Sequence, residues 1–391
     1  MLRVLRYRLY PTPAQDATLR RTLERLREVY NAALQERRDA YQKQGITLRA
    51  YAQMAELKGV REVREDLATI HTHLLQDAIT RLDRAYQSFF RRCKAGETPG
   101  FPRFKGKGRY RSFTFKDCTV KKRWLVGGGK RLSLSGVGNV KIKLHRPLEG
   151  TLKQVRVRLD GDGNWYASMV CDDVRRQVLP GTGQSVGVDV GITTFATLST
   201  GEGIHSPRPY RAAQERLAAA QRRVAHKRNK RSNGRRKAVA LLGRQHAKVE
   251  RIRRDFHRKV ASDLVVQFDT IKVENLNIKG LAAGMLAKHV HDAGWAQFIE
   301  ILAGKAESAG RELIKVDPRG TSQECSRCGA VVRKSLAVRV HACPECGLVL
   351  GRDHNAAIII ETRPGHGRRG RGEPWRDPLI PRSPFLTPTT A

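Results

Sequence analysis

The stretch TSQECSRCGAVVRKSLAVRVHACPECGLVLGRDHN, residues 321–355, carries four of the seven cysteines of this 391-residue chain. They form two pairs of the type Cys-x2-Cys, which are Cys325 with Cys328 and Cys343 with Cys346. Each pair places two thiolates on one tight turn, and two such turns facing each other supply four ligands for tetrahedral zinc. Gly329 and Gly347 each follow a second cysteine, where the turn favours a residue that tolerates positive φ. The sequence therefore predicts a structural zinc ribbon over 321–349.

An isolated acid follows the ribbon. Asp353 stands in GRDHNAAIIIE, at the start of an apolar run with helical character. A carboxylate directly after a zinc ribbon suggests that the ribbon lies beside a functional site. The alternative for Asp353 alone is a helix N-cap.

The charge of the chain is strongly one-sided. Lysine and arginine number 75 against 37 aspartates and glutamates, which gives a formal net charge of +38. A chain with this excess repels itself unless a polyanion shares the charge, so nucleic acid is the predicted partner. A merely cationic soluble enzyme is the alternative.

Two further features of the sequence indicate the cellular compartment. No apolar segment is long enough to span a bilayer, and the start MLRVLRYRLYPTP lacks the apolar core of a signal peptide, so we expect no membrane partner. Cys93, Cys118 and Cys171 are scattered and odd in number, which argues against a disulfide framework and favours a reducing cell interior.

The first half of the chain predicts a β module with a helical insertion. Residues 2–10 alternate as a strand, and residues 12–93 repeat apolar side chains at helical spacing, after a capping box that begins at Thr12. Residues 119–172 have β texture and predict a small barrel or curved sheet that the N-terminal strand completes.

Residues 96–116 interleave aromatic and basic side chains, as a nucleic-acid surface does. A twisted hairpin whose aromatics face the core is the alternative, and both can hold on opposite faces of a strand. The candidate contacts are Arg103, Phe104, Lys105, Arg109, Tyr110 and Arg111.

The second half reads as a strand pair, two basic helices, a strand, a helix, a strand, the zinc ribbon and a last helix. This order is typical of an RNase H-like α/β domain, which we expect over 185–320 and 350–362. The basic helices predict phosphate contacts, with a solvated helix face as the alternative. Their candidate contact residues are Lys227, Arg228, Arg235 and Arg236.

Three acids stand at informative places in this domain. Asp189 lies within the apolar strand VGVDVG, Glu274 ends the strand IKVE, and Asp353 opens the last helix. An acid in an apolar strand is unfavourable unless something compensates it. Converging carboxylates predict a Mg²⁺ site, with two ions about 3.5–4 Å apart for phosphodiester hydrolysis. The turn VDVGITT also fits the phosphate turn of an actin-like ATPase, and Glu274 alone fits a capped strand end.

Several segments together resemble the TnpB/OrfB family of transposon-encoded RNA-guided DNA endonucleases, which are related to type V CRISPR effectors. The resemblance covers about 1–362, and its segments are LRYRLYPTPAQ at 5–15, GFPRFK at 100–105, VGVDVG at 186–191, VENL at 273–276, DAGW at 292–295, TSQECSRCG at 321–329, and CPECG with RDHNAA within 343–357. Gly351 replaces the first acid of the family's usual Asp-Arg-Asp pattern, but Asp353 is the acid that matches.

The resemblance implies a split RuvC nuclease with Asp189, Glu274 and Asp353 as its acids and a target-loading module on the zinc ribbon. It implies a wedge barrel at 1–10 and 95–180 and a helical recognition module at 11–94. The implied partners are a guide RNA from the transposon end and double-stranded target DNA beside a short motif, bound by a monomer in the prokaryotic cytoplasm at the nucleoid.

Two expectations complete the analysis. The tail, residues 363–391, is rich in Pro, Gly and Arg and is expected to be disordered. The alternative function is a catalytically idle RNA-guided or direct DNA-binding regulator of transposition, which shares the charge and the ribbon but does not need the carboxylates.

Overall fold

The structure is a computed structural model that describes residues 1–116, 118, 124–229, 232–335 and 337–365. It divides into two compact units, each described by itself below. Unit 1 comprises 1–177 and 209–252, and unit 2 comprises 178–208 and 253 onward. Among the described helices, none is both long and apolar enough to cross a membrane.

Unit 1 contains an antiparallel sheet whose central strand is the N-terminal one. The strands are β1 (Arg3–Tyr10), β2 (Ser112–Phe115), β3 (Leu125–Val126), β4 (Arg131–Leu134), β5 (Gly138–Lys143), β6 (Thr151–Leu159) and β7 (Trp165–Asp172), in the order β2-β6-β7-β1-β5-β4-β3. Strand β1 pairs with β5 on one side and β7 on the other, so it completes the sheet as predicted.

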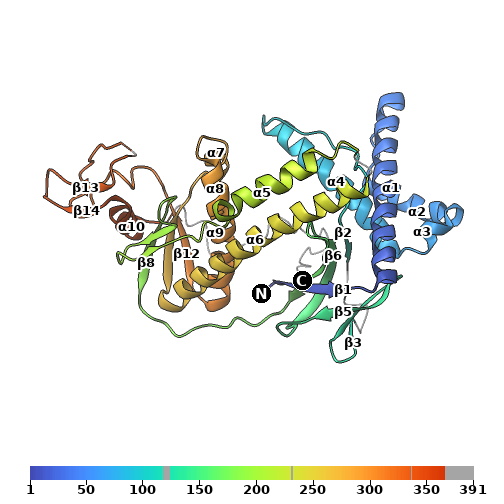
Figure 1. Ribbon diagram of the computed structural model, residues 1–391, viewed down its shortest axis with the longest axis horizontal. Helices are drawn as coiled ribbons and strands as arrows, with labels where there is room; N and C mark the ends of the chain where they lie inside the picture. Colours follow the sequence, from blue (N-terminus) through green and yellow to red (C-terminus); the bar gives the residue numbers. More distant parts are fainter. Residues whose placement is uncertain (117, 119–123, 230–231, 336, 366–391) are drawn as a thin grey trace, which may run out of the picture. The chain divides into compact units, whose positions relative to one another are not determined.

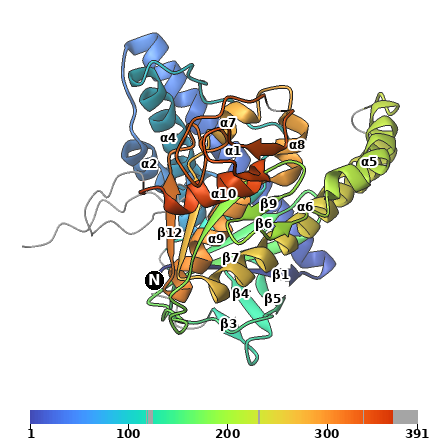
Figure 2. The same ribbon diagram turned by 90° about the vertical axis from the view of Figure 1, so that its left-hand side faces the viewer.

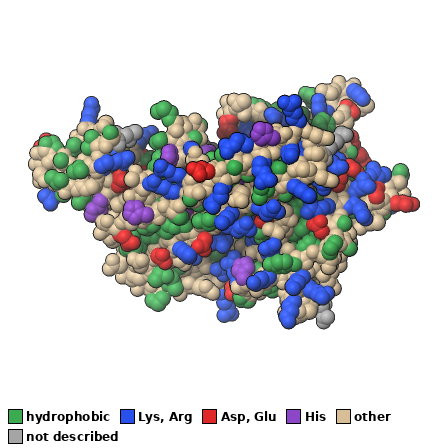
Figure 3. Space-filling model, in the orientation of Figure 1, with side chains coloured by type: hydrophobic (Ala, Val, Ile, Leu, Met, Phe, Trp, Pro, Cys, Tyr) green, Lys and Arg blue, Asp and Glu red, His purple; other side chains and the backbone are tan. Residues whose placement is uncertain are grey.

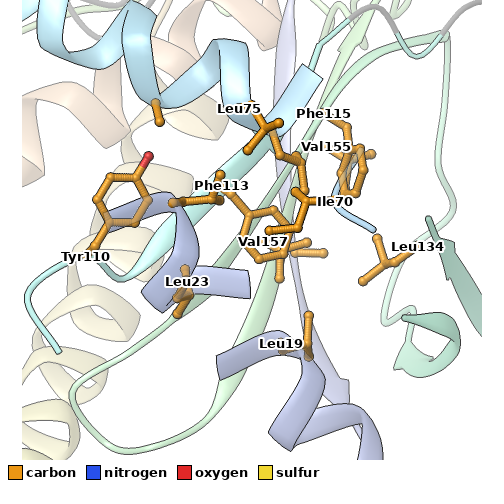
Figure 4. Close-up of a cluster of buried hydrophobic side chains, with 14 of the residues drawn as sticks. Leu19, Leu23, Ile70, Leu75, Tyr110, Phe113, Phe115, Leu134, Val155 and Val157 are labelled. Atoms are coloured by element: carbon orange, nitrogen blue, oxygen red, sulfur yellow. The ribbon is translucent and has the colours of Figure 1, made fainter. Parts of the chain in front are cut away.

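A helical insertion separates β1 from the other strands. It contains α1 (Pro13–Gln44), α2 (Ala50–Val63), α3 (Glu65–Ala68) and α4 (Thr72–Lys94). The predicted capping box is present at α1, where the Thr12 side chain accepts from the Gln15 N–H and the Gln15 side chain accepts from the Thr12 N–H. Helix, turn and strand residues share one core, which includes Leu19 of α1, Ile70 before α4 and Val157 of β6 (Figure 4).

Two basic helices also belong to unit 1 over much of their length. They are α5 (Pro209–Ala225) and α6 (Asn233–Gln267), and a small cluster of Ala213, Leu217 and Val249 joins them. A Cβ at Gly243 would lie 1.9 Å from the Gly161 carbonyl oxygen, so α6 rests directly on the turn between β6 and β7. Arg251 pairs with Asp162 of the same turn at 3.3 Å. Figure 3 shows Lys and Arg side chains gathered over these helices.

Unit 2 is built on a five-stranded sheet in the order β10-β9-β8-β11-β12. Its strands are β8 (Ser185–Val190), β9 (Ala196–Leu198), β10 (Gly203–Ile204), β11 (Thr270–Glu274) and β12 (Glu312–Val316). Pairing is antiparallel between β10 and β9 and between β9 and β8, and it is parallel between β8 and β11 and between β11 and β12. If the five strands are numbered by their order in the chain, their order across the sheet is 3-2-1-4-5, which agrees with the RNase H-like arrangement predicted from the sequence. The short β10 was not predicted.

Helices cover both faces of this sheet. One face packs on α9 (Trp295–Ala309) and the C-terminal part of α6, through a core that includes Val186, Val188, Phe298 and Leu302. The other face carries α10 (Arg352–Thr362), which crosses the sheet in Figure 2. Two short helices, α7 (Ile278–Leu281) and α8 (Ala287–Ala293), connect β11 to α9.

The zinc ribbon lies between β12 and α10. Its two-stranded sheet pairs β13 (Val340–Ala342) with β14 (Val349–Gly351), and β14 leads directly into α10 (Figure 1). The predicted disordered tail lies outside the described residues from position 366 onward. Within the described part, Arg363 donates to the Asp317 and Arg319 carbonyl oxygens at 2.7 Å each.

Candidate active site and zinc centre

Strand alternation places two of the three acids on the face that α10 covers. In β8, Val186 and Val188 point into the core with α9, so Gly187 and Asp189 point the other way. In β11, Ile271 and Val273 occupy the same core, which sends Glu274 to the α10 side. Val273 pairs in register with Val188, so Glu274 and Asp189 each lie one residue further along neighbouring strands.

A glycine permits the close approach of α10 to this face. A Cβ at Gly187 would lie 2.0 Å from the Ala357 carbonyl oxygen and 2.6 Å from the Glu361 nitrogen, both of α10. No side chain fits there without moving the helix. Gly187, two residues before Asp189, therefore lets the helix that begins with Arg352 and Asp353 pack closely on the strand.

The three acids lie close enough for two of them to influence the ionisation of the third. Burial, together with the neighbouring charges of Glu274 and Asp353, raises the pKa of Asp189 to about 8, against a lowering by Arg352. Arg352 also contacts Asp353, with Nε 3.3 Å from Oδ1. A group of carboxylates that hinders its own ionisation is stabilised when a cation binds. The donor set therefore fits a hard divalent ion such as Mg²⁺.

A hydroxyl that sequence reasoning missed orients the second acid. Glu274 is buried, and burial raises its pKa while a hydrogen bond from Thr321 lowers it. The Thr321 Oγ1 donates to Glu274 Oε1 at 2.5 Å. Thr321 precedes the first cysteine pair, so the entry to the ribbon contacts the carboxylate site directly.

The four cysteines converge as the sequence predicted. Among the described residues they are the one group of at least three His, Cys, Asp or Glu side chains whose ligand atoms all lie within 4.8 Å of one another. The Sγ atoms of Cys325 and Cys346 lie 3.6 Å apart, as do those of Cys328 and Cys343. Tetrahedral Zn–S bonds of about 2.3 Å require roughly 3.8 Å between sulfurs, so the cluster fits zinc. Gly329 and Gly347 adopt φ of 77° and 70°, as the turns require.

Among the predicted nucleic-acid contacts before β2, most side chains are accessible. Arg103, Phe104, Arg109 and Arg111 are exposed and Lys105 is half-buried. The loop is held to α1 because Asn31 exchanges hydrogen bonds with the Lys105 backbone, at 2.8 and 3.0 Å.

Tyr110 has a different environment. It is 6% exposed, and its ring lies with Phe113 in the core of unit 1 (Figure 4), where it is not positioned to stack on a base. The aromatics of this segment thus divide between surface and core, as the alternative from the sequence allowed.

The predicted contacts on the basic helices also differ in exposure. Lys227 and Arg228 lie in the connection after α5, Arg236 lies on α6, and all three are exposed. Arg235 is half-buried and donates to the Val224 and Lys227 carbonyl oxygens at 2.8 and 2.7 Å, so it holds the end of α5. Such a side chain organises the helix pair as well as contributing charge.

This geometry defines an RNase H-like α/β protein with a zinc ribbon inserted before its last helix. Three family models match: OrfB_IS605, described as "Probable transposase", over 168–284; the Cas12f1-like TNB domain over 295–360; and a helix-turn-helix domain, HTH_OrfB_IS605, over 1–45. The chain belongs to the TnpB/OrfB family, as its sequence resemblance predicted. The described part of 1–45 is a strand followed by one long helix rather than two helices joined by a turn.

Two relatives share nearly the whole chain. A protein of Streptomyces pristinaespiralis is 35% identical over 92% of this chain and 88% of its own length, and InsQ of Escherichia coli K12 is 28% identical over 95% and 94%. Both are named "Putative RNA-guided DNA endonuclease". A cryo-EM structure of a Cas12f1–sgRNA–target DNA complex aligns over 93% of this chain and 99% of its own, at 16% identity and a TM-score of 0.36.

Proposed function

We propose that this protein is an RNA-guided DNA endonuclease encoded by an insertion-sequence transposon, which cleaves target DNA next to a short motif. One observation carries the proposal: three carboxylates from two neighbouring strands and the last helix share one face of the RNase H-like sheet, and together with burial they raise the pKa of Asp189 to about 8. The family membership and the names of the two full-length relatives support it.

The carboxylates are assigned the role of holding magnesium. Asp189, Glu274 and Asp353 would hold the ion, in a site of oxygen ligands that suits its preference. When bound, magnesium supplies an activated water and stabilises the charge that develops on the phosphate during hydrolysis. Thr321 keeps the buried Glu274 oriented, and Arg352 pairs with Asp353.

The zinc centre has a structural role in this proposal. The four cysteines close the ribbon with thiolates alone and leave no ligand position for a water or a substrate, as structural sites do. The ribbon begins next to Glu274 and ends at Asp353, so it is suited to meet nucleic acid beside the site of cleavage.

The nucleic acids are assigned to the basic surfaces. Sequence specificity would come from pairing between a guide RNA derived from the transposon end and double-stranded target DNA, while the protein contacts backbones and reads a short motif. The exposed contacts before β2 and on α5 and α6 supply the positive charge. The complex would act as a monomer in the prokaryotic cytoplasm, at the nucleoid.

The domain assignment follows the same reasoning. Residues 1–10 and 95–180 form the wedge module and 11–94 the recognition module, while 185–320 with 350–362 form the nuclease domain around the ribbon at 321–349. Residues 209–252, which lie within the segment 185–320 assigned to the nuclease domain, are grouped with unit 1.

Purification with co-expressed RNA tests the function. Sequencing the co-purified RNA should reveal a guide that matches the transposon end, and the complex should cut a matching DNA library in the presence of Mg²⁺. Asp189→Ala should abolish cleavage and leave RNA and target binding intact. A variant that still cuts would show that the carboxylate assignment is wrong.

The alternative, a regulator that binds without cutting, shares every feature except the use of the carboxylates. A wild-type complex that binds matched DNA but never cleaves it in Mg²⁺ or Mn²⁺ would establish this alternative. The convergence of three acids at one face argues against it, because a binder has no need to bury mutually repelling carboxylates.

A further inference from the structure

A buried threonine connects the entry of the zinc ribbon to the carboxylate site. Thr321 is 4% exposed, and its hydroxyl has two acceptors in reach: Glu274 Oε1 at 2.5 Å and the Pro318 carbonyl oxygen at 3.1 Å. One hydroxyl hydrogen serves one of them at a time, and an ionised carboxylate is the stronger acceptor. The position of the ribbon entry and the orientation of Glu274 therefore depend on each other.

A buried asparagine connects the first zinc turn to the last helix. Asn355 is 0% exposed and lies two residues after Asp353 in α10. Its Oδ1 accepts from the Ser326 N–H at 2.9 Å, and its Nδ2 donates to the Glu324 carbonyl oxygen at 2.7 Å. Ser326 and Glu324 flank Cys325, so one amide holds both sides of a zinc-ligating residue.

The other end of α10 holds the same segment. Arg363 follows the helix and reaches Glu324 Oε2 at 2.5 Å and the Asp317 carbonyl oxygen at 2.7 Å. The segment from 317 to 326 is thus fixed at Glu274 and at both ends of α10. Neither Thr321 nor Asn355 is a metal ligand, and the fold alone does not require a polar side chain at either buried position.

We propose that Thr321 and Asn355 form a latch through which the zinc-loaded ribbon holds Glu274 and Asp353 in their metal-binding positions. Without zinc the four cysteines lose the bonds that hold the two turns together, and the turn around Cys325 then loses the geometry that Asn355 binds. Linkage is reciprocal, so zinc in the ribbon strengthens divalent-cation binding at the carboxylates and that cation strengthens zinc binding. The assignment of the carboxylates as a metal site rests on the proposed function.

Two measurements on the full-length RNA complex test the latch without requiring cleavage. Zinc release is followed with a chelating dye, and Mn²⁺ binding by electron paramagnetic resonance, counting only the Mn²⁺ signal that Asp189→Asn removes. Loss of a supporting hydrogen bond to a metal site typically weakens metal binding by 10–100-fold. Asn355→Ala should accelerate zinc release about tenfold or more and also weaken Mn²⁺ binding.

Graded variants separate the two contacts. Thr321→Val should weaken Mn²⁺ binding about tenfold with full zinc content, and Thr321→Ser should restore it because the hydroxyl remains. Asn355→Asp retains the acceptor for Ser326 but loses the donor to Glu324, so its zinc release should lie between wild type and Asn355→Ala. The matched controls are Asn277→Ala and Thr362→Val, whose side chains bond only to neighbouring backbone, and both should match wild type.

The outcomes distinguish the latch from the function. If Asn355→Ala folds and leaves zinc release and Mn²⁺ binding unchanged, the latch is wrong whether or not the protein cuts DNA. If Asn355→Ala does not fold, Thr321→Val decides, and unchanged Mn²⁺ binding overturns the latch. If both variants behave as expected but the wild type never cleaves matched DNA, the latch stands and the nuclease function fails.

Discussion

Replacing Asp189 by asparagine should remove activity and at the same time stabilise the metal-free protein. Burial and two neighbouring carboxylates raise the pKa of Asp189 from 3.8 to about 8. The folded protein therefore binds a proton that the unfolded chain has released, and stability is lost as the pH rises from about 4 toward 8. At pH 7 the pH lies roughly three units above the pKa of the unfolded chain, and at about 1.4 kcal/mol per unit the lost free energy of unfolding is about 4 kcal/mol. Asparagine carries no such penalty, and we expect it to recover about 2–4 kcal/mol after relaxation.

Thermal unfolding and amide exchange in β8 and β11, with and without Mg²⁺, measure this effect. Wild type should gain stability when Mg²⁺ is added, because an ion that binds only the folded state stabilises it. Asp189→Asn should be more stable than wild type without metal and should respond little to Mg²⁺. The control Asp255→Asn removes an exposed acid of α6 and should change neither. A metal-free Asp189→Asn that is less stable than wild type, or that Mg²⁺ protects equally, would refute the reasoning.

Three further predictions concern the ribbon, the helix contact and a buried imidazole. Cys343→Ser should release zinc, measured by metal analysis, and abolish cleavage while circular dichroism shows the sheets still folded; full activity without zinc would contradict the coupling. Gly187→Ala should destabilise unit 2 by about 1–3 kcal/mol in denaturant unfolding, because its Cβ would meet Ala357, whereas Gly59→Ala in α2, with open space around it, should be neutral or stabilising. Burial lowers the pKa of His257 to about 4, so the folded state resists protonation and stability should fall by up to about 3 kcal/mol between pH 6.5 and 4; His257→Gln should weaken this pH dependence, and an unchanged slope would contradict it.

Local sequence signals predicted the elements well. The capping box at Thr12 gave the start of α1, and the strands β3 to β7 lie within the segment 119–172 that was predicted to be β. The two Cys-x2-Cys pairs gave the zinc turns, because their geometry is set by neighbours in the chain. The three acids were predicted as site residues because each is a charged residue in or beside an apolar segment.

Contacts between distant segments were not predictable in the same way. Nothing near Thr321 in the sequence indicates that its hydroxyl binds Glu274, which lies 47 residues away. From the sequence, Asn355 is an ordinary polar residue early in a helix. In the structure it is fully buried and accepts a hydrogen bond from Ser326 of the first zinc turn. Tyr110 and Phe104 stand in one basic segment, and only the packing of β2 on the helices decides which one is buried.

Several residues of unit 2 are types that their strand or helix disfavours, and their positions support a functional site without reference to the family. Gly187 weakens a strand, Asp189 and Glu274 place acids in apolar strands, and Asn355 buries an amide in an apolar helix. If such departures were accidents of drift, they would be scattered over the fold and each would be compensated locally. Gly187, Asp189 and Glu274 instead lie where α10 packs against β8 and β11, and Asn355 lies on the same helix against the first zinc turn, while the pKa of Asp189 remains raised despite the neighbouring Arg352. A natural chain retains unfavourable features at one place when a ligand completes that place. The partner that we propose is a cation, at a face that lies next to Thr321 at the start of the zinc ribbon and Asp353 just after its end.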